Sequence, residues 1–154
     1  MWNTAKFRSN KHMSSAMKTA EEVIGAVGFS VMTVRPGDTC LAMGISDLPI
    51  LAPGHLMSVM ESACVAALGE YLETGETTIV DKFDVSVIDS VGIGLEIRAT
   101  ARCTEMDGRS MIFECDIYEG ERHIAFAIIE RTAVERVSFL ARTAAQSLIK
   151  AVEN

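Results

Sequence analysis

The chain has 154 residues, of which 49% are hydrophobic and 23% charged, and its net charge is −7. This is the composition of a globular protein with a sizeable core, and it excludes a disordered chain. Residues 1–20 carry four basic and no acidic side chains, a charge of +4, so the rest of the chain carries −11 and is not expected to bind nucleic acid or an anionic membrane.

Residues 1–19 are expected to form a basic, disordered head, with a transit-like leader as the alternative, and 20–154 a single domain. The head lacks the apolar run of a secretory signal. Four cysteines lie in apolar or alternating stretches without a Cys-x-x-Cys pair, which predicts reduced core residues of a cytoplasmic protein. No metal-ligand spacing and no glycine-rich phosphate loop occurs, so we expect no metal and no cofactor. The cysteines are Cys40, Cys64, Cys103 and Cys115.

The first third of the sequence alternates between short elements and turns. Residues 20–27 favour a short helix, and 28–44 favour extended chain with a bend at Pro36-Gly37-Asp38. A loop with two prolines follows. The run from Gly54 to Leu72 is long, rich in Ala, Leu and Met and free of proline, which favours a helix that stops by Gly75. The longer stretch 48–69 contains two prolines and several polar residues and has no flanking basic residues, which excludes a membrane-spanning helix.

From residue 77 the hydrophobic period changes to two, which predicts strands over 77–88, 92–104 and 109–118. Asp107-Gly108 and 119–121 are hairpin turns, and the nearly continuous apolar run 122–134 predicts a strand inside the sheet. The alternation places the following residues on one face of each of the first three strands, with Asp81 interrupting the first apolar face: Ile79, Asp81, Phe83, Val85 and Val87; then Ile93, Leu95, Ile97, Ala99, Ala101 and Cys103; then Met111, Phe113, Cys115 and Ile117.

The last segment, 135–154, returns to helical spacing. The order strand, long helix, four strands, helix with tight turns predicts an antiparallel α+β sheet. A helix that is apolar nearly all round must be covered on nearly all sides, and a curved sheet wrapped around it does this. The arrangement resembles the hot-dog fold, which implies a homodimer or dimer of dimers, paired edge to edge, with ligand sites at the dimer interface. The stripe of the last helix is Val137, Leu140, Ala144, Leu148 and Val152.

One carboxylate interrupts the apolar run from Pro53 to Gly69, and burying it costs several kcal/mol unless a partner or a reaction uses it. That residue is Glu61. The run "LAPGHLMSVMESACVAALGEYLETGE", with the later "DGRSMIFECDIYEGE" and "ERTAVERVSFLAR", resembles the fluoroacetyl-CoA thioesterase-like branch of hot-dog proteins. In that family the helix starts with Ala-Thr-Gly or Ala-Thr-Pro, and a glutamate follows eight residues after the threonine. Ala52-Pro53-Gly54 and Glu61 fall in this register.

Two family positions differ in this sequence. The family threonine falls at Pro53, and the family histidine falls at or near Val87. Of the threonine, glutamate and histidine that the resemblance implies, only Glu61 is present. A complete copy of that mechanism, and its selectivity for a fluorinated acyl group, are therefore not expected.

The remaining residues still support thioester chemistry. The backbone N–H groups of Gly54 and His55 at the helix start are expected to stabilise an oxyanion, and Glu61 to act as a base or a nucleophile. The alternative for Glu61 is a structural acid bonded to backbone, Ser or Arg, and for His55 a surface residue. The predicted substrate-binding residues are Pro53, Ser58, Asp81 and Val87, with Asp81 either facing solvent or serving as a second carboxylate in the site.

The sequence therefore predicts a thioesterase that hydrolyses a small acyl thioester, such as an acyl-CoA. The alternative is a non-catalytic hot-dog protein that binds a small ligand or acyl-CoA. A hot-dog dehydratase is disfavoured, because it would need a histidine shortly before the helix and none lies between Met13 and Gly54.

Overall fold

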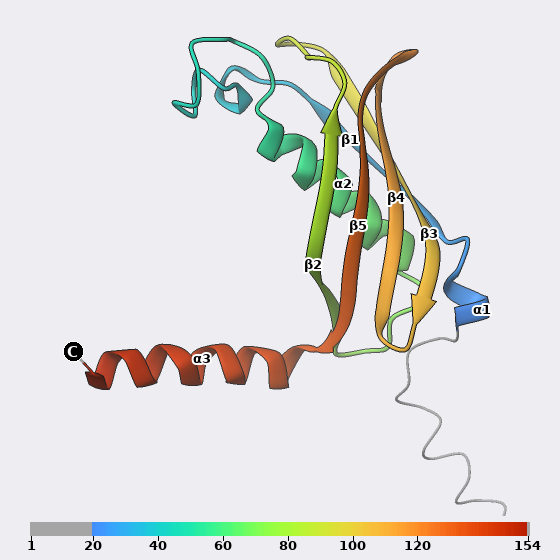
Figure 1. The fold of residues 1–154 in the computed structure, drawn as a ribbon, viewed down its shortest axis with the longest axis vertical. Coiled ribbons are helices and arrows are strands. Elements are labelled where there is room, and N and C mark those ends of the chain that lie inside the picture. Colours follow the sequence, from blue (N-terminus) through green and yellow to red (C-terminus); the bar gives the residue numbers. More distant parts are fainter. Residues whose placement is uncertain (1–19, 154) are drawn as a thin grey trace, which may run out of the picture.

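The computed structural model describes residues 20–153 (Figure 1). The head predicted at 1–19 lies outside the described residues. Five strands form one sheet, one long helix lies along it, and a second long helix leaves it at one end. The elements are α1 (Ala20–Val23), β1 (Val27–Thr33), the 3-10 turn η2 (Pro36–Asp38), α2 (Pro53–Leu68), β2 (Glu76–Val87), β3 (Glu96–Asp107), β4 (Ser110–Glu119), β5 (Arg122–Glu135) and α3 (Arg136–Glu153).

The strands follow the order β1-β3-β4-β5-β2, and every neighbouring pair is antiparallel. The α+β architecture predicted from the sequence is confirmed. Strand β5 pairs on both sides, as its continuous apolar run predicts. Both hairpin turns are confirmed, because Gly108 and Gly120 take the positive φ angles that these tight turns require.

The core lies between the sheet and α2, which packs mainly against β1 and β3. At Gly28 of β1 the two backbones touch: a Cβ there would lie 2.2 Å from the carbonyl oxygen of Ala63 and 2.3 Å from the nitrogen of Ala67. Only glycine fits this position, and the two alanines on the facing side of α2 allow the helix to approach so closely. Strand β1 therefore anchors the helix that carries the candidate site.

The strand faces follow the predicted alternation in β3 and β4, where all the predicted positions within the strands are buried. The prediction is wrong for Ile93 and Leu95, because both precede β3 and are exposed. A second error lies in β2, where a β-bulge between Val80 and Lys82 shifts the register. Consequently Ile79 pairs with Thr132 on the outer face, whereas Phe83, Val85 and Val87 pair with buried residues of β5 on the inner face.

Helix α2 ends earlier than the sequence predicts, at Leu68 rather than near Leu72, with Gly69 as the residue that follows it. It is also not covered on nearly all sides. Ser58, Ser62 and Val65 are exposed along the side of the helix that is not packed on the sheet. Contacts between α2 and β2 are sparse, so a border between these two elements stays open.

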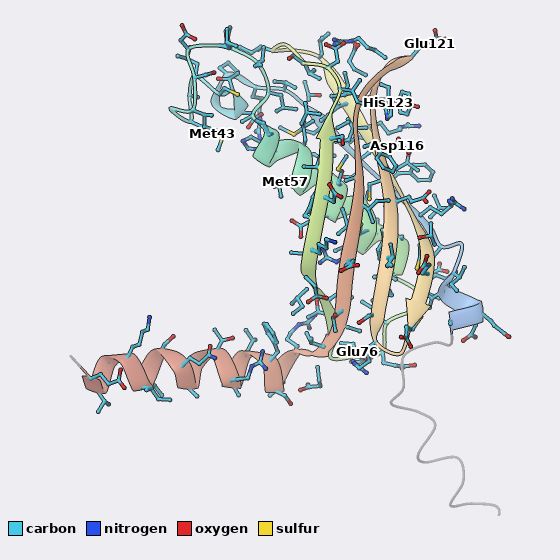
Figure 2. The ribbon with its side chains drawn as sticks, viewed as in Figure 1. Met43, Met57, Glu76, Asp116, Glu121 and His123 are labelled. Carbon is cyan, nitrogen blue, oxygen red and sulfur yellow. The ribbon has the colours of Figure 1, made fainter. Side chains whose placement is uncertain are left out.

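The predicted C-terminal helix is present as α3, and its stripe is not buried: every residue from Arg136 to Glu153 is exposed or half-exposed. Figure 2 shows its side chains directed outward around the whole helix. All four cysteines are buried, as predicted. Burial raises the pKa of the Cys103 thiol to about 11. No described helix has the length and apolarity needed to cross a membrane.

Candidate active site

Glu61 is held by an arginine near the C-terminal end of β5. Arg131 of β5 donates from Nη1 to Oε1 of Glu61 at 3.0 Å, across seventy positions of sequence. The same guanidinium donates from Nε to the hydroxyl of Thr78 and from Nη2 to its carbonyl, both at 3.0 Å. Three charge-assisted hydrogen bonds fix the arginine, and its charge stabilises the Glu61 carboxylate.

The two partners differ in exposure. The Arg131 side chain is 6% exposed, whereas the Glu61 side chain is 35% exposed. Among the described residues Oε1 alone has a bonded partner, so Oε2 remains accessible. The pair lies at the open border between α2 and β2, since Thr78 belongs to β2. A carboxylate held at one oxygen and open at the other is suited to accept a proton.

The start of α2 offers one oxyanion donor rather than two. The backbone N–H of His55 donates to the carbonyl of Ala52 at 3.0 Å, so the prediction that it is free was wrong. Here the chain turns tightly into the helix, and that turn uses the His55 donor. The N–H of Gly54 has no partner among the described residues, and a Cβ at Gly54 would meet nothing within 4 Å. The space over this helix start is open to a ligand.

Glu61 lies seven residues beyond Gly54 on the same helix, which is about 10 Å along the axis. Helical side chains lean toward the N-terminus, so the carboxylate lies closer to Gly54 than its Cα does. The hydroxyl of Ser58, between them, donates to the carbonyl of Gly54 at 3.1 Å. Its proton is therefore committed to the helix backbone, and only its lone pairs are available to a ligand.

Pro53 and Val87 meet at one cavity. Its volume is about 70 Å³, and it also contacts Leu56 of α2 and Ile124 of β5. The two positions where the family resemblance implies threonine and histidine are thus neighbours in space, although 34 residues separate them. Both present carbon to the cavity, whose lining is mainly apolar apart from Asp89 and Ser90, so these two positions supply no threonine–histidine pair.

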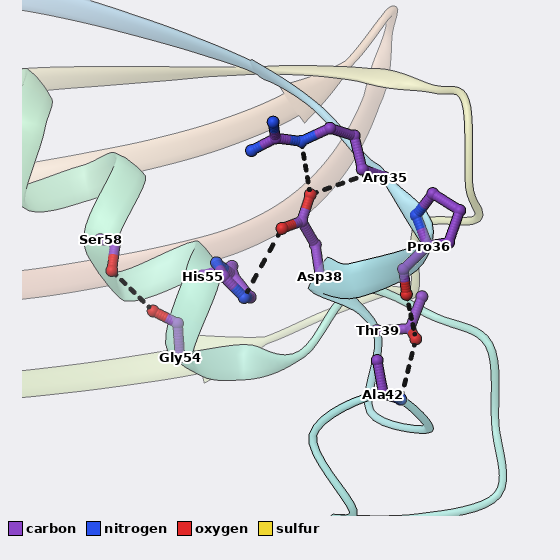
Figure 3. A network of polar contacts seen from close by, with 8 residues as sticks. All are labelled: Arg35, Pro36, Asp38, Thr39, Ala42, Gly54, His55 and Ser58. Carbon is purple, nitrogen blue, oxygen red and sulfur yellow. Dashed lines mark hydrogen bonds and ion pairs between the residues drawn. The ribbon is translucent and has the colours of Figure 1, made fainter.

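A second polar cluster lies beside the helix start (Figure 3). Asp38 accepts from the backbone N–H of Arg35 at 2.9 Å, and its Oδ1 lies 3.9 Å from Nε2 of His55. The backbone bond from Arg35 lowers the pKa of Asp38, and the nearby charges of Arg35 and His55 lower it further. The His55 imidazole therefore faces a fixed carboxylate and is drawn toward η2.

Asp81 is not part of this arrangement. It lies at the bulge of β2 and accepts from the hydroxyl of Thr132. Thr132 follows the buried Arg131, so it faces the outer side of the sheet, away from α2. Of the two alternatives for Asp81, the solvent-facing one is correct, because Asp81 is exposed and lies on the face of the sheet away from Glu61.

Residues 34–137 match the model described as fluoroacetyl-CoA-specific thioesterase, which covers well over half of the chain. The chain belongs to this thioesterase family. The matched range includes all the candidate residues at the start of α2 and Arg131, whereas all but the first two residues of α3 lie beyond it.

Individual thioesterases are also similar to this chain in sequence or in structure. The fluoroacetyl-CoA thioesterase of Streptantibioticus cattleyicolor is 28% identical over 93 residues, covering 60% of this chain and 67% of that protein. A solved structure of a fluoroacetyl-CoA thioesterase variant with fluoroacetate superposes with a TM-score of 0.75 at 24% identity, covering 80% of this chain and 97% of that one. A thioesterase superfamily member from Thermus thermophilus gives 0.77 at 20% identity, covering 84% and 96%. These structures confirm the hot-dog fold.

Three residues of the candidate site in this thioesterase could not be identified from the sequence. Arg131 stands beside Glu130 in a largely apolar stretch of strand, so as one of two adjacent charges it gave a weaker signal than the isolated Glu61. Thr78 and Asp38 gave no such signal, because each lies in a polar neighbourhood. The pairing of Glu61 with Arg131 joins residues seventy positions apart in the sequence, and no local pattern encodes it.

Proposed function

We propose that the chain hydrolyses a short acyl thioester of the acyl-CoA type at the start of α2, with Glu61 as general base or nucleophile. The observation that carries this proposal is the Glu61 carboxylate, held at one oxygen by a buried arginine and open at the other. The oxygen that Arg131 leaves open belongs to a partly exposed side chain, so a water molecule or a ligand can reach it. Membership of a thioesterase family supports the same chemistry.

In the base route, Glu61 takes a proton from water as the water oxygen bonds to the thioester carbonyl carbon. The carbonyl oxygen becomes an oxyanion, which the N–H of Gly54 and the positive end of α2 stabilise. The carbon–sulfur bond then breaks, and the thiolate leaves with the proton that Glu61 held. In the nucleophile route, Glu61 attacks the carbonyl first, and water hydrolyses the resulting anhydride. Both routes yield one carboxylic acid and one thiol.

The recess at Pro53 and Val87 favours a short acyl group. It is small, mainly apolar and adjacent to the open helix start. Because the family threonine and histidine positions carry no polar group here, we do not expect selectivity for a fluorinated acyl chain. Acetyl-CoA is the natural first substrate to test, since a variant of the fluoroacetyl-CoA thioesterase has been solved with it.

We further propose that the active unit is a homodimer, or a dimer of dimers, formed through β2. This strand is an edge of the sheet, with its inner residues Val80 and Val87 exposed. An unpaired edge is a liability that pairing removes. A partner at β2 would cover the open border and enclose Glu61 at the dimer interface.

The second candidate is a binding protein that holds an acyl-CoA without cleaving it. The observation that favours it is the pair Pro53 and Val87, which leave the helix start without a hydroxyl or an imidazole from those positions. In this case Glu61 and Arg131 would only position a ligand or stabilise the fold.

The role of the α2 start in catalysis can be tested by replacing the glycines at the two ends of this helix with alanine. Gly54→Ala places a methyl group in open space where the thioester would approach, so the rate of CoA release from acetyl-CoA should fall about 10²-fold, the scale of one lost oxyanion donor. Gly69→Ala is the matched control, since its nearest neighbour, the carbonyl of Ala66 at 3.7 Å, is an ordinary contact. Equal rates in the two variants would remove the helix start from the mechanism.

A further inference from the structure

Helix α3 has an apolar face that nothing in its own protomer covers. Leu140, Leu148 and Val152 of its stripe are 58%, 68% and 87% exposed. Helices of this length obtain most of their stability from packing an amphipathic face, and an isolated one is marginal in water. The stripe therefore needs a surface to lie against.

A second uncovered apolar surface lies in the loop between η2 and α2. Leu41, Met43, Ile45 and Leu48 are all about half exposed, and we call residues 41–48 the apolar loop. The apolar loop adjoins the candidate site, because Cys40 before it and Ile50 after it line the recess at Pro53.

The two surfaces cannot meet within one protomer. Figure 1 shows α3 leaving one end of the sheet and running out past β2, whereas the apolar loop extends past β2 at the opposite end. In Figure 2, Met43 of the apolar loop lies at one end of the molecule, and Glu76, beside the start of α3, lies at the other end.

Self-pairing of β2 brings these surfaces together. Two copies of one strand that pair antiparallel are related by a two-fold axis perpendicular to the sheet, and this rotation exchanges the two ends. The α3 helix of one protomer then lies at the end where the partner's apolar loop extends, and the contact occurs twice. Charge favours the contact between these two surfaces, because α3 carries +2 and the apolar loop −1.

We propose that α3 docks on the apolar loop of a second copy of this chain and closes the wall of that copy's recess. The proposal rests on the β2-paired dimer of the proposed function, and it does not depend on which acyl group is bound. Since α3 lies almost entirely beyond the family match, this contact is a property of the chain and not of the shared fold. Each active site would thus be completed by its partner's helix.

The test is cross-linking between differently tagged, co-expressed chains. One chain carries Leu148→Cys and the other Ile45→Cys, and a short bismaleimide reagent joins only cysteines that lie close. The four native cysteines are buried and will not react in the folded protein. We expect a covalent heterodimer from this pair, and none from the control pair in which Gln146→Cys, on the polar face of α3, replaces Leu148→Cys.

Charge insertion supplies a second readout. Leu148→Glu should raise the dissociation constant of the dimer about tenfold or more, because two copies of a buried leucine contact are lost, whereas Gln146→Glu should not. The proposal is overturned if both variants dimerise like the wild type or if the two cross-linking pairs give equal yield. It is also overturned if wild type, but not Leu148→Glu, binds vesicles of anionic phospholipid, which would assign the stripe to a membrane surface. If the wild-type protein is a monomer, the β2-paired dimer of the proposed function is itself wrong.

Discussion

Replacing Glu61 with glutamine is expected to lower the turnover of an accepted acyl thioester about 10²-fold or more, the usual scale of lost general acid–base assistance. Glutamine keeps the shape of the side chain, and its amide oxygen can still accept the hydrogen bond that Arg131 now donates at 3.0 Å. Folding should therefore be largely preserved. The measurement is kcat for CoA release from acetyl-CoA, together with the melting temperature of each protein.

Glu70→Gln is the matched control, because it removes one carboxylate from an exposed position just beyond α2. It should leave both kcat and stability unchanged. If Glu61 is a structural acid, Glu61→Gln will instead keep the wild-type rate and lower the free energy of unfolding by about 1–3 kcal/mol, through the weakened bond to Arg131. That pattern would end the catalytic role of Glu61 and favour the binding-protein alternative.

Gly28→Ala should be the most destabilising single-methyl change in the chain. Its Cβ would lie 2.2 Å from a backbone oxygen of α2, and neither backbone can move without shifting the whole helix against β1. We expect a loss of about 3 kcal/mol in the free energy of unfolding, at the upper end of overpacking costs, and a melting temperature lower by about 6–12 °C. Thermal and urea unfolding measure both quantities.

Gly54→Ala serves as the stability control, since a Cβ there meets nothing within 4 Å. Its free energy of unfolding should stay within about 0.5 kcal/mol of the wild type. A Gly28→Ala protein as stable as Gly54→Ala would show that α2 does not press on β1 as described, and the placement of Glu61 on that helix would need revision.

Much of the fold could be predicted because its signals are local. The alternation of 97–103 and 111–117 needs only neighbouring residues, and glycines at 108 and 120 supply the positive φ of tight turns. The bulge in β2 has no such signal. It depends on how β2 fits β5, and it moved Ile79 to the outer face, away from the apolar face that the alternation predicts.

The site was predicted less completely than the fold. The sequence identified Glu61 as out of place in an apolar run, and it related Pro53 and Val87 through a family register. It did not identify Arg131 as the partner of Glu61, because that contact joins α2 to the far end of the last strand. It also assigned the His55 N–H to an oxyanion, whereas the turn into α2 uses that donor.

The difference between a thioesterase and a binding protein is decided most directly by comparing cleavage and binding in one preparation. The wild-type protein is mixed with acetyl-CoA and longer acyl-CoAs, and release of the CoA thiol is measured beside equilibrium binding of the matching non-hydrolysable thioethers. We predict that the short-chain analogues bind, that their thioesters are cleaved, and that cleavage falls as the acyl chain outgrows the recess at Pro53 and Val87. Tight binding of the short-chain thioethers with no release of thiol above the uncatalysed rate would contradict the account.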